Sequence, residues 1–210
     1  MIRLILLLSF LLSSPASGFA ESRYKIADNT LIFNMTVAEQ GYAFDGGLES
    51  YDEDEVISYL FDNPEITTLR VTGPGGSASA SSAIAEYLAR HNINTEAFGE
   101  CDSACAHIFL GGETRTLSPE AKLGFHRTWI DREYIKKNYV ENRIEEGWDD
   151  EFDYAQILFG SAIASMVEDV EFMLSRGVDI DFILRIFSTD SHDMWVPTRE
   201  ELLSAGVLTK

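Results

Sequence analysis

The stretch Thr67–Ser77, TTLRVTGPGGS, decides the fold class that this sequence predicts. Thr67–Thr72 is short and rich in β-branched and apolar residues, which favours a strand, and Gly73–Gly76 (GPGG) ends it in a turn. The next residues, Ser77–His91, are rich in alanine and serine and place their large apolar side chains on one face at helical spacing. The stretch therefore predicts a strand, a glycine turn and a helix in succession.

The same alternation of strand-like and helix-like segments continues along the chain. The other elements expected from hydrophobic periodicity are a strand at Leu31–Val37, a helix at Asp52–Phe61, a strand at Asn94–Phe98, a helix at Asp102–Leu110, two short strands within Leu117–Phe125 and a long helix at Glu151–Arg176. Strands that alternate with helices predict a single α/β domain whose strands are joined by crossover helices.

The N-terminus has the layout of a secretory signal peptide. Arg3 carries a positive charge, Leu4–Leu12 is an apolar run, and small residues follow up to Ala20. The run is too short to cross a bilayer, which takes ~20 residues. We predict a signal peptide at 1–20, a mature domain at 21–210 and a periplasmic or secreted protein. An uncleaved anchor or a buried core segment is the alternative.

The charge balance of the chain disfavours several kinds of partner. Lysine and arginine number 16 against 35 aspartates and glutamates, so the formal net charge is −19. This charge repels nucleic-acid backbones and anionic membrane surfaces, and the chain after residue 20 has no second long apolar stretch, so neither nucleic-acid binding nor a stable membrane span is predicted. The acidic run Asp52–Glu55 lacks the spaced ligands and glycine of a calcium loop. We predict no metal site and no cofactor.

Two glycine-bounded segments carry the candidate chemistry, Gly73–Gly76 and Gly99–Cys105 (GECDSAC). In α/β sheets, reactive groups gather at the carboxyl ends of strands, where helix N-termini present free N–H groups. Gly75 has no side chain, so its backbone N–H can approach a substrate carbonyl, and Ser103 is expected at a helix start that favours an oxyanion. Alone, each segment is an ordinary turn. Together they outline an oxyanion site beside a serine nucleophile.

From Tyr42 to the C-terminus the chain carries five motifs in one order. They are Phe44–Glu49 (FDGGLE), Thr72–Ser77 (TGPGGS), Gly99–Gly112 around the serine, Leu117–His126 (LSPEAKLGFH), and Asp193–Val196 (DMWV) followed by Ala205–Leu208 (AGVL). In this order they resemble the Clp peptidase and crotonase superfamily, specifically its Clp-like serine peptidases and their secreted relatives. The resemblance implies a spiral of β-β-α units and a serine endopeptidase that acts on peptide or protein substrates.

The resemblance also implies a role for each candidate site residue. Ser103 matches the nucleophile, His126 the general base and Asp193 the acid that orients the imidazole. Gly75 and Ala104 match the backbone donors to the oxyanion. These roles fit the chemistry, because a serine hydroxyl is a weak nucleophile until an imidazole takes its proton, and a carboxylate fixes the tautomer of that imidazole.

Other assignments of the polar residues stay open. His107 lies four residues after Ser103 and could share its helix face as an alternative base, or simply pack there. Asp193 could be a turn residue among polar neighbours. His91 is expected at a helix C-terminus, where a cation is favoured, and His192 is expected to be a bystander.

The chain departs from the family pattern in three places. Cys101 and Cys105 bracket the serine; in an oxidising compartment residues at this spacing can form a disulfide, and the alternative is two buried free thiols. Glu100 and Asp102 oppose an oxyanion unless they point away, and Asp102 is suited to cap the helix. The segment 127–150 is longer and more charged than the family's connection, so we expect a helical insertion or flap there.

These departures keep other functions under consideration. The insertion occupies the region through which Clp peptidases assemble their rings, so the sequence leaves homo-oligomer formation open. The main alternative to a peptidase is a non-catalytic binding module that keeps the fold. An acyl-thioester enzyme of the crotonase type is less favoured, since coenzyme A thioesters are absent outside the cytoplasm.

Overall fold

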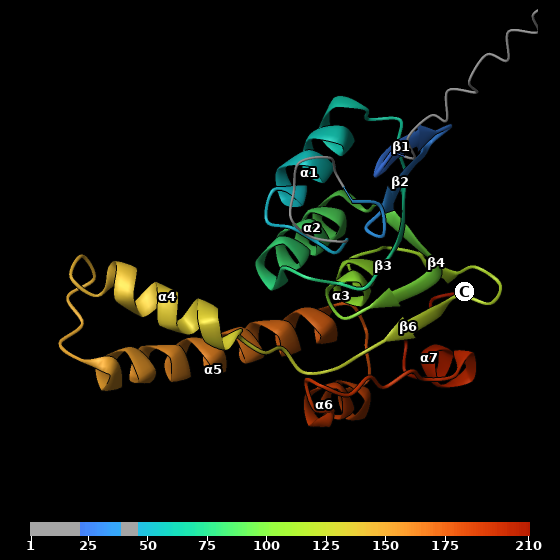
Figure 1. Ribbon diagram of the computed structural model, residues 1–210. Coiled ribbons are helices and arrows are strands. Elements are labelled where there is room, and N and C mark those ends of the chain that lie inside the picture. Colours follow the sequence, from blue (N-terminus) through green and yellow to red (C-terminus); the bar gives the residue numbers. More distant parts are fainter. Residues whose placement is uncertain (1–21, 39–45) are drawn as a thin grey trace, which may run out of the picture.

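A computed structural model of the chain describes residues 22–38 and 46–210 (Figure 1). Its elements, in chain order, are β1 (Tyr24–Ala27), β2 (Thr30–Asn34), α1 (Asp52–Asp62), β3 (Thr68–Gly73), α2 (Ala78–His91), β4 (Asn94–Asp102), α3 (Ala104–Leu110), β5 (Arg115–Leu117), β6 (Lys122–Gly124), α4 (Arg132–Asn142), α5 (Glu151–Ser175), α6 (Ile180–Ser188) and α7 (Arg199–Ser204). The predicted signal peptide at 1–20 and the start of the family resemblance, at 42–45, lie outside the described residues.

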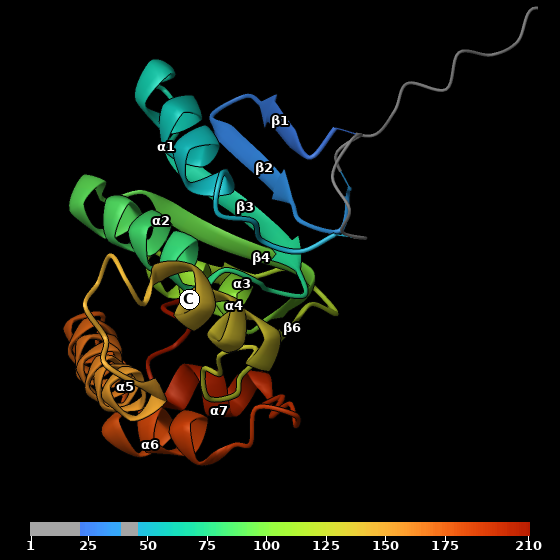
Figure 2. The ribbon, with the colours of Figure 1, turned by 60° about the vertical axis from the view of Figure 1, so that its left-hand side comes forward.

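The strands of this part of the chain form one mixed sheet in the order β1-β2-β3-β4-β5, and β6 also pairs with β4. The pair β1–β2 is antiparallel, and the other pairs are parallel. Helices α1, α2 and α3 make the crossovers and lie side by side along the sheet (Figures 1 and 2). The predicted α/β class is therefore confirmed.

The core lies between the sheet and these three helices. Its largest fully buried side chains come from both layers and include Leu31, Phe33, Leu69, Ile84, Leu88, Ile108, Phe109 and Leu123. Burial of apolar surface stabilises the fold by ~25 cal/mol per Å². Because this packing fixes β3 and β4, it also fixes the two turns that follow their carboxyl ends.

The predicted boundary between β4 and the next helix is wrong. β4 extends beyond the expected strand at Asn94–Phe98 and includes Asp102, which we expected at a helix start. The reason is that β6 pairs with Glu100–Asp102, while Gly99 takes a φ of +63° where the pairing with β3 becomes irregular. Asp102 therefore caps no helix, and α3 begins at Ala104.

The other predicted elements lie where the sequence indicates, with small shifts at their ends. β2 ends at Asn34 instead of Val37, because the Asn34 side chain accepts hydrogen bonds from the backbone and hydroxyl of Thr36 and turns the chain. α2 begins directly after Ser77, whose hydroxyl accepts a hydrogen bond from the N–H of Ala80. Such an N-cap is worth ~1 kcal/mol.

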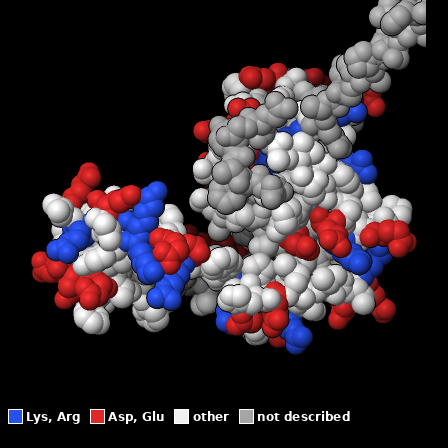
Figure 3. Space-filling view, in the orientation of Figure 1, with Lys and Arg blue, Asp and Glu red and all other residues white. Residues whose placement is uncertain are grey.

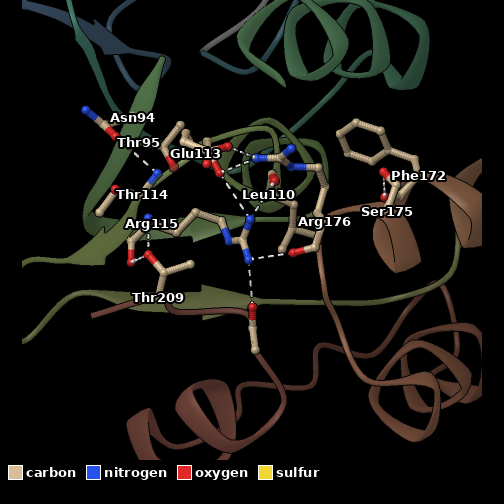
Figure 4. A network of polar contacts seen from close by, with 12 residues as sticks. Asn94, Thr95, Leu110, Glu113, Thr114, Arg115, Phe172, Ser175, Arg176 and Thr209 are labelled. Carbon is tan, nitrogen blue, oxygen red and sulfur yellow. Dashed lines mark hydrogen bonds and ion pairs between the residues drawn. The ribbon is translucent and has the colours of Figure 1, made fainter. Parts of the chain in front are cut away.

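Arg115 joins the ends of three elements inside the molecule (Figure 4). Its side chain is 2% exposed, and its guanidinium donates hydrogen bonds to the carbonyl oxygens of Gly112, Arg176, Gly206 and Val207 at 2.7–3.0 Å. Burial, and then the charge of Arg176, lower the pKa of Arg115 to about 10. One buried cation thus connects the residues that follow α3, α5 and α7.

A helical arm that begins with α4 projects from the body of the molecule (Figure 1). It consists of α4, which lies in the predicted insertion at 127–150, the connection 143–150 and the first part of α5. Aromatic rings of Tyr139, Trp148 and Tyr154 stack inside it. Its surface carries both basic and acidic side chains (Figure 3) and the exposed apolar residues Val140, Ile144, Phe152 and Phe159.

A helix that spans a membrane takes ~20 predominantly apolar residues. Within residues 22–38 and 46–210, no helix is both long and apolar enough to cross a membrane.

Candidate active site

Ser103 occupies a strained turn between β4 and α3. Its φ of +57° is uncommon for a residue with a side chain, and its N–H donates a hydrogen bond of 2.8 Å to the carbonyl of Gly124. Its hydroxyl makes no capping hydrogen bond with α3. The backbone therefore presents Ser103 at a sharp strand-to-helix turn with a positive φ, and its hydroxyl is not used to cap α3.

A disulfide joins the two sides of this turn. Cys101 in β4 and Cys105 in the first turn of α3 are bonded, with their Cα atoms 5.1 Å apart. Both side chains are fully buried. The predicted disulfide is therefore confirmed, and it links the end of β4, just before Ser103, to the first turn of α3.

The backbone of Gly75 lies directly against the Ser103 turn. A Cβ built on Gly75 would lie 2.8 Å from the Cβ of Ser103 and 2.9 Å from the nitrogen of Ala104, and the φ of Gly75 is +92°. Only glycine fits this contact without a shift. Leu48 holds the glycine segment from its other side, since its N–H donates to Gly75 and its carbonyl accepts from Ser77. The two predicted oxyanion donors are thus adjacent.

The N–H of Ala104 is free of the helix that it begins. It belongs to the first turn of α3, where N–H groups have no acceptor within the helix and the helix dipole is positive. The backbone of Gly75 and the N–H of Ala104 therefore lie close together beside Ser103, and Ala104 also lines the cavity described next.

Ser103, Ala104 and His126 line one cavity of about 620 Å³. His126 lies two residues after the end of β6 and is partly exposed. The Nδ1 atom of His126 lies 2.8 Å from the carbonyl oxygen of Arg127. A carbonyl oxygen only accepts, so this contact places the hydrogen on Nδ1 and leaves the lone pair of Nε2 available as a base.

The structure does not bring Asp193 to this histidine. Phe125 and Trp195 exchange two backbone hydrogen bonds of 2.9 Å, and the continuation of this register sets His126 opposite Met194. Asp193 is exposed, lies outside the cavity wall and donates its N–H to Asp190 at 3.0 Å. In the described chain its carboxylate makes no hydrogen bond or ion pair.

The two acidic neighbours of Ser103 do not line its cavity. Glu100 and Asp102 line a separate cavity of about 560 Å³ with Gly73 and Pro74, on the other side of the glycine segment. Burial, and then the charge of Glu100, raise the pKa of Asp102, while His126 lowers it. The Asp102 carboxylate lies against Gly124, near enough to His126 for their charges to interact.

His107 and Asp169 enter the same cavity from α3 and α5. The ring of His107 stacks on Phe172, and burial lowers its pKa to about 4 although Glu86 opposes this shift, so the ring is neutral at neutral pH. Burial, and then the charge of Glu168, raise the pKa of Asp169 to about 6. Our reading of the sequence missed Asp169, although an acidic pair within an apolar helix is a visible signal.

The remaining histidines lie where their local sequence suggests. His91 ends α2, and its Nδ1 lies 2.8 Å from the carbonyl oxygen of Tyr87. His192 is exposed and contacts the carboxylate of Asp190. Neither residue lines the Ser103 cavity. Among the described residues, no group of three or more histidine, cysteine, aspartate or glutamate side chains is arranged to hold a metal ion.

Comparison with protein-family models and with curated proteins identifies no relative of this chain. No family model matches the chain, and no curated protein matches it significantly. The site must therefore be interpreted from its own residues.

Proposed function

We propose that this chain is a secreted or periplasmic serine peptidase in which Ser103 forms an acyl-enzyme. The observation that carries the proposal is the contact between the strained Ser103 turn and the backbone of Gly75 and Ala104, with His126 on the same cavity. The mixed sheet and its crossover helices are compatible with the spiral of β-β-α units that the family resemblance implies, and the spiral is part of the proposal.

The proposed reaction follows from this geometry. The Ser103 hydroxyl attacks the peptide carbonyl, and Nε2 of His126 takes its proton as general base. The N–H groups of Gly75 and Ala104 stabilise the oxyanion, where one such donor is typically worth ~3 kcal/mol. His126 then protonates the leaving amine, which departs. A water molecule, deprotonated by the same histidine, attacks the acyl-enzyme and releases the acid.

The group that orients His126 in this structure differs from the one in a complete Ser-His-Asp triad. The Arg127 carbonyl now accepts from Nδ1, the position where the triad carboxylate would bind. For Asp193 to act as the proposed acid, its segment must move toward His126. That segment is exposed and is held by the ion pair of Arg127 with Asp190.

This difference favours one second candidate function, a peptide-binding module without catalysis. Its supporting observation is the position of Asp193, outside the cavity and without a bond to His126. The same cavity and the same backbone donors would then bind a peptide carbonyl without cleaving it.

Export and assembly complete the proposal. A disulfide persists in oxidising compartments, so the Cys101–Cys105 bond supports a periplasmic or extracellular location and the signal peptide at 1–20. The exposed apolar residues of the arm support self-association of the chain, which sedimentation would detect.

A fluorophosphonate probe tests the catalytic proposal. We expect it to label the full chain exported into an oxidising compartment, and Ser103→Ala to abolish the labelling. Ser82→Ala is the matched control, because Ser82 lines the same cavity but donates its hydroxyl to the carbonyl of Ala78. Absent labelling, or equal labelling of wild type and Ser103→Ala, would falsify the peptidase proposal.

A further inference from the structure

The Ser103 cavity continues into a second cavity of about 510 Å³ beneath α5. The two cavities share wall residues from α2, from the segment 128–130 and from α5. A peptide bound with its carbonyl at Ser103 therefore has a groove open to it between α2 and α5. The walls of this groove would contact the side chains near the reacting bond.

Asp169 is the acidic residue that lines both cavities. Its side chain is only partly exposed, and within the described chain it makes no hydrogen bond or ion pair. Its pKa, raised to about 6 by burial and by Glu168, shows that the ionised carboxylate is poorly solvated there. A carboxylate in this condition gains most from a cation that enters the cavity.

The surroundings of Asp169 suit a cation on an apolar stem. Phe172 and Phe187 line the second cavity, and Met173 lines the first. Such walls accept the methylene groups of a lysine or arginine side chain while the charged end reaches the carboxylate. The one lysine or arginine that the described chain contributes to these walls is Arg127, and Asp190 already neutralises it.

We propose that Asp169 is a specificity-determining residue that binds the ammonium or guanidinium group of a lysine or arginine side chain in the peptide substrate. The inference rests on the proposed function for its substrate class, since it takes the ligand of the cavity to be a peptide. The binding position beside Asp169 excludes acidic side chains of the substrate, because Glu86 and Glu168 also line the second cavity and would repel them.

Direct binding tests the role of Asp169 separately from catalysis. The protein is the full chain with Ser103→Ala, and the probes are fluorescent tetra-alanine peptides in which one position at a time is lysine or, in the matched set, norleucine. Norleucine keeps most of the stem and lacks the charge. We expect at least one lysine position to bind about tenfold or more tightly than its norleucine counterpart, as measured by fluorescence polarisation.

The variants assign this preference to one carboxylate. Asp169→Asn should abolish the lysine preference while norleucine peptides bind within about twofold of the parent, and Asp169→Glu should retain the preference. Glu171→Gln is the matched control on the same helix, because Glu171 is exposed and lines neither cavity. Thermal unfolding verifies that each variant is folded; Asp169→Asn removes a poorly solvated charge, so we expect no loss of stability.

Each outcome has one meaning. Equal binding of lysine and norleucine peptides at every position, or a lysine preference that survives in Asp169→Asn, overturns the inference. Loss of preference in Asp169→Asn but not in Glu171→Gln supports it. Fluorophosphonate labelling of the chain with serine at position 103 is measured in parallel, so a lysine preference without labelling rejects the peptidase and retains a site for basic peptides.

Discussion

Replacement of Arg115 by methionine should cost a large part of the stability of this protein. Methionine fills a similar volume but donates no hydrogen bond, so Arg115→Met removes a donor from four carbonyl oxygens, of which Gly112 alone keeps a second donor, the guanidinium of Arg176. A hydrogen bond from a charged donor contributes ~1.5–3 kcal/mol. The full sum is not expected, because the variant also no longer buries a charge, a cost that the lowered pKa of about 10 reflects.

The expected net loss is ~3–5 kcal/mol, which compares with a total stability of ~5–15 kcal/mol for a domain. Urea unfolding followed by circular dichroism, under conditions that keep the disulfide intact, measures it as a lower midpoint at an unchanged slope. Arg90→Met is the control: Arg90 is on the surface of α2 and bonds one carbonyl of its own helix, so its loss should change stability by less than ~0.5 kcal/mol.

Arg115→Lys separates charge from geometry. Lysine keeps the charge but has three donors on one nitrogen, which cannot reach four carbonyls spread over three segments. We expect an intermediate loss. If the free energy of unfolding of Arg115→Met lies within about 1 kcal/mol of the wild-type value, the hydrogen bonds of Arg115 in Figure 4 do not hold the ends of α3, α5 and α7 together, and the reasoning is refuted.

Three further predictions concern the Ser103 site. The pKa of His107 is about 4 in the folded protein and ~6.5 in the unfolded chain, so its contribution to the free energy of unfolding is complete above pH 6.5 and falls by up to ~3 kcal/mol as the pH falls to 4. Urea unfolding at pH 7 and at pH 4.5 should therefore show that His107→Gln loses less stability in acid than the wild type does. Equal losses would contradict this. Gly75→Ala should lower fluorophosphonate labelling at least ~100-fold because its Cβ collides with the Ser103 turn, whereas Gly160→Ala, with nothing within 4 Å of its Cβ, should label normally; normal labelling of Gly75→Ala would reject the oxyanion role. Asp193→Asn should reduce peptide turnover by ~10⁴-fold if Asp193 completes the triad, and turnover within threefold of the wild type would leave the Arg127 carbonyl as the group that orients His126.

Local sequence was sufficient for the elements that form from local patterns. The strand, glycine turn and helix around Gly73–Gly76 could be predicted because periodicity and turn chemistry act over a few residues. The pairing of Cys101 with Cys105 was predictable for the same reason, since four residues at a helix start fix the distance. The place of Asp193 was not, because it depends on the Phe125–Trp195 pairing, which joins segments 70 residues apart.

The same limit explains the two other differences. β4 continues to Asp102 because β6 supplies partners from 22 residues downstream, and no pattern within β4 reveals them. Asp169 belongs to a helix whose first part projects from the body, and only the tertiary fold brings its later part to the cavities that α2 and the segment 128–130 also line. Long-range packing, and not local propensity, decides which polar side chains meet.

If the chain is exported as proposed, the bond between Cys101 and Cys105 also determines when this site matures. Reducing agents in the cytosol keep thiols free, so a newly made chain would carry the Ser103 turn without its covalent link. On the proposed route the link closes only after export, and both sulfurs must meet before the core seals them, since both are fully buried in the final fold. Oxidation would then precede the last stage of folding, and the nucleophile would become ordered only in the compartment where its substrates are found.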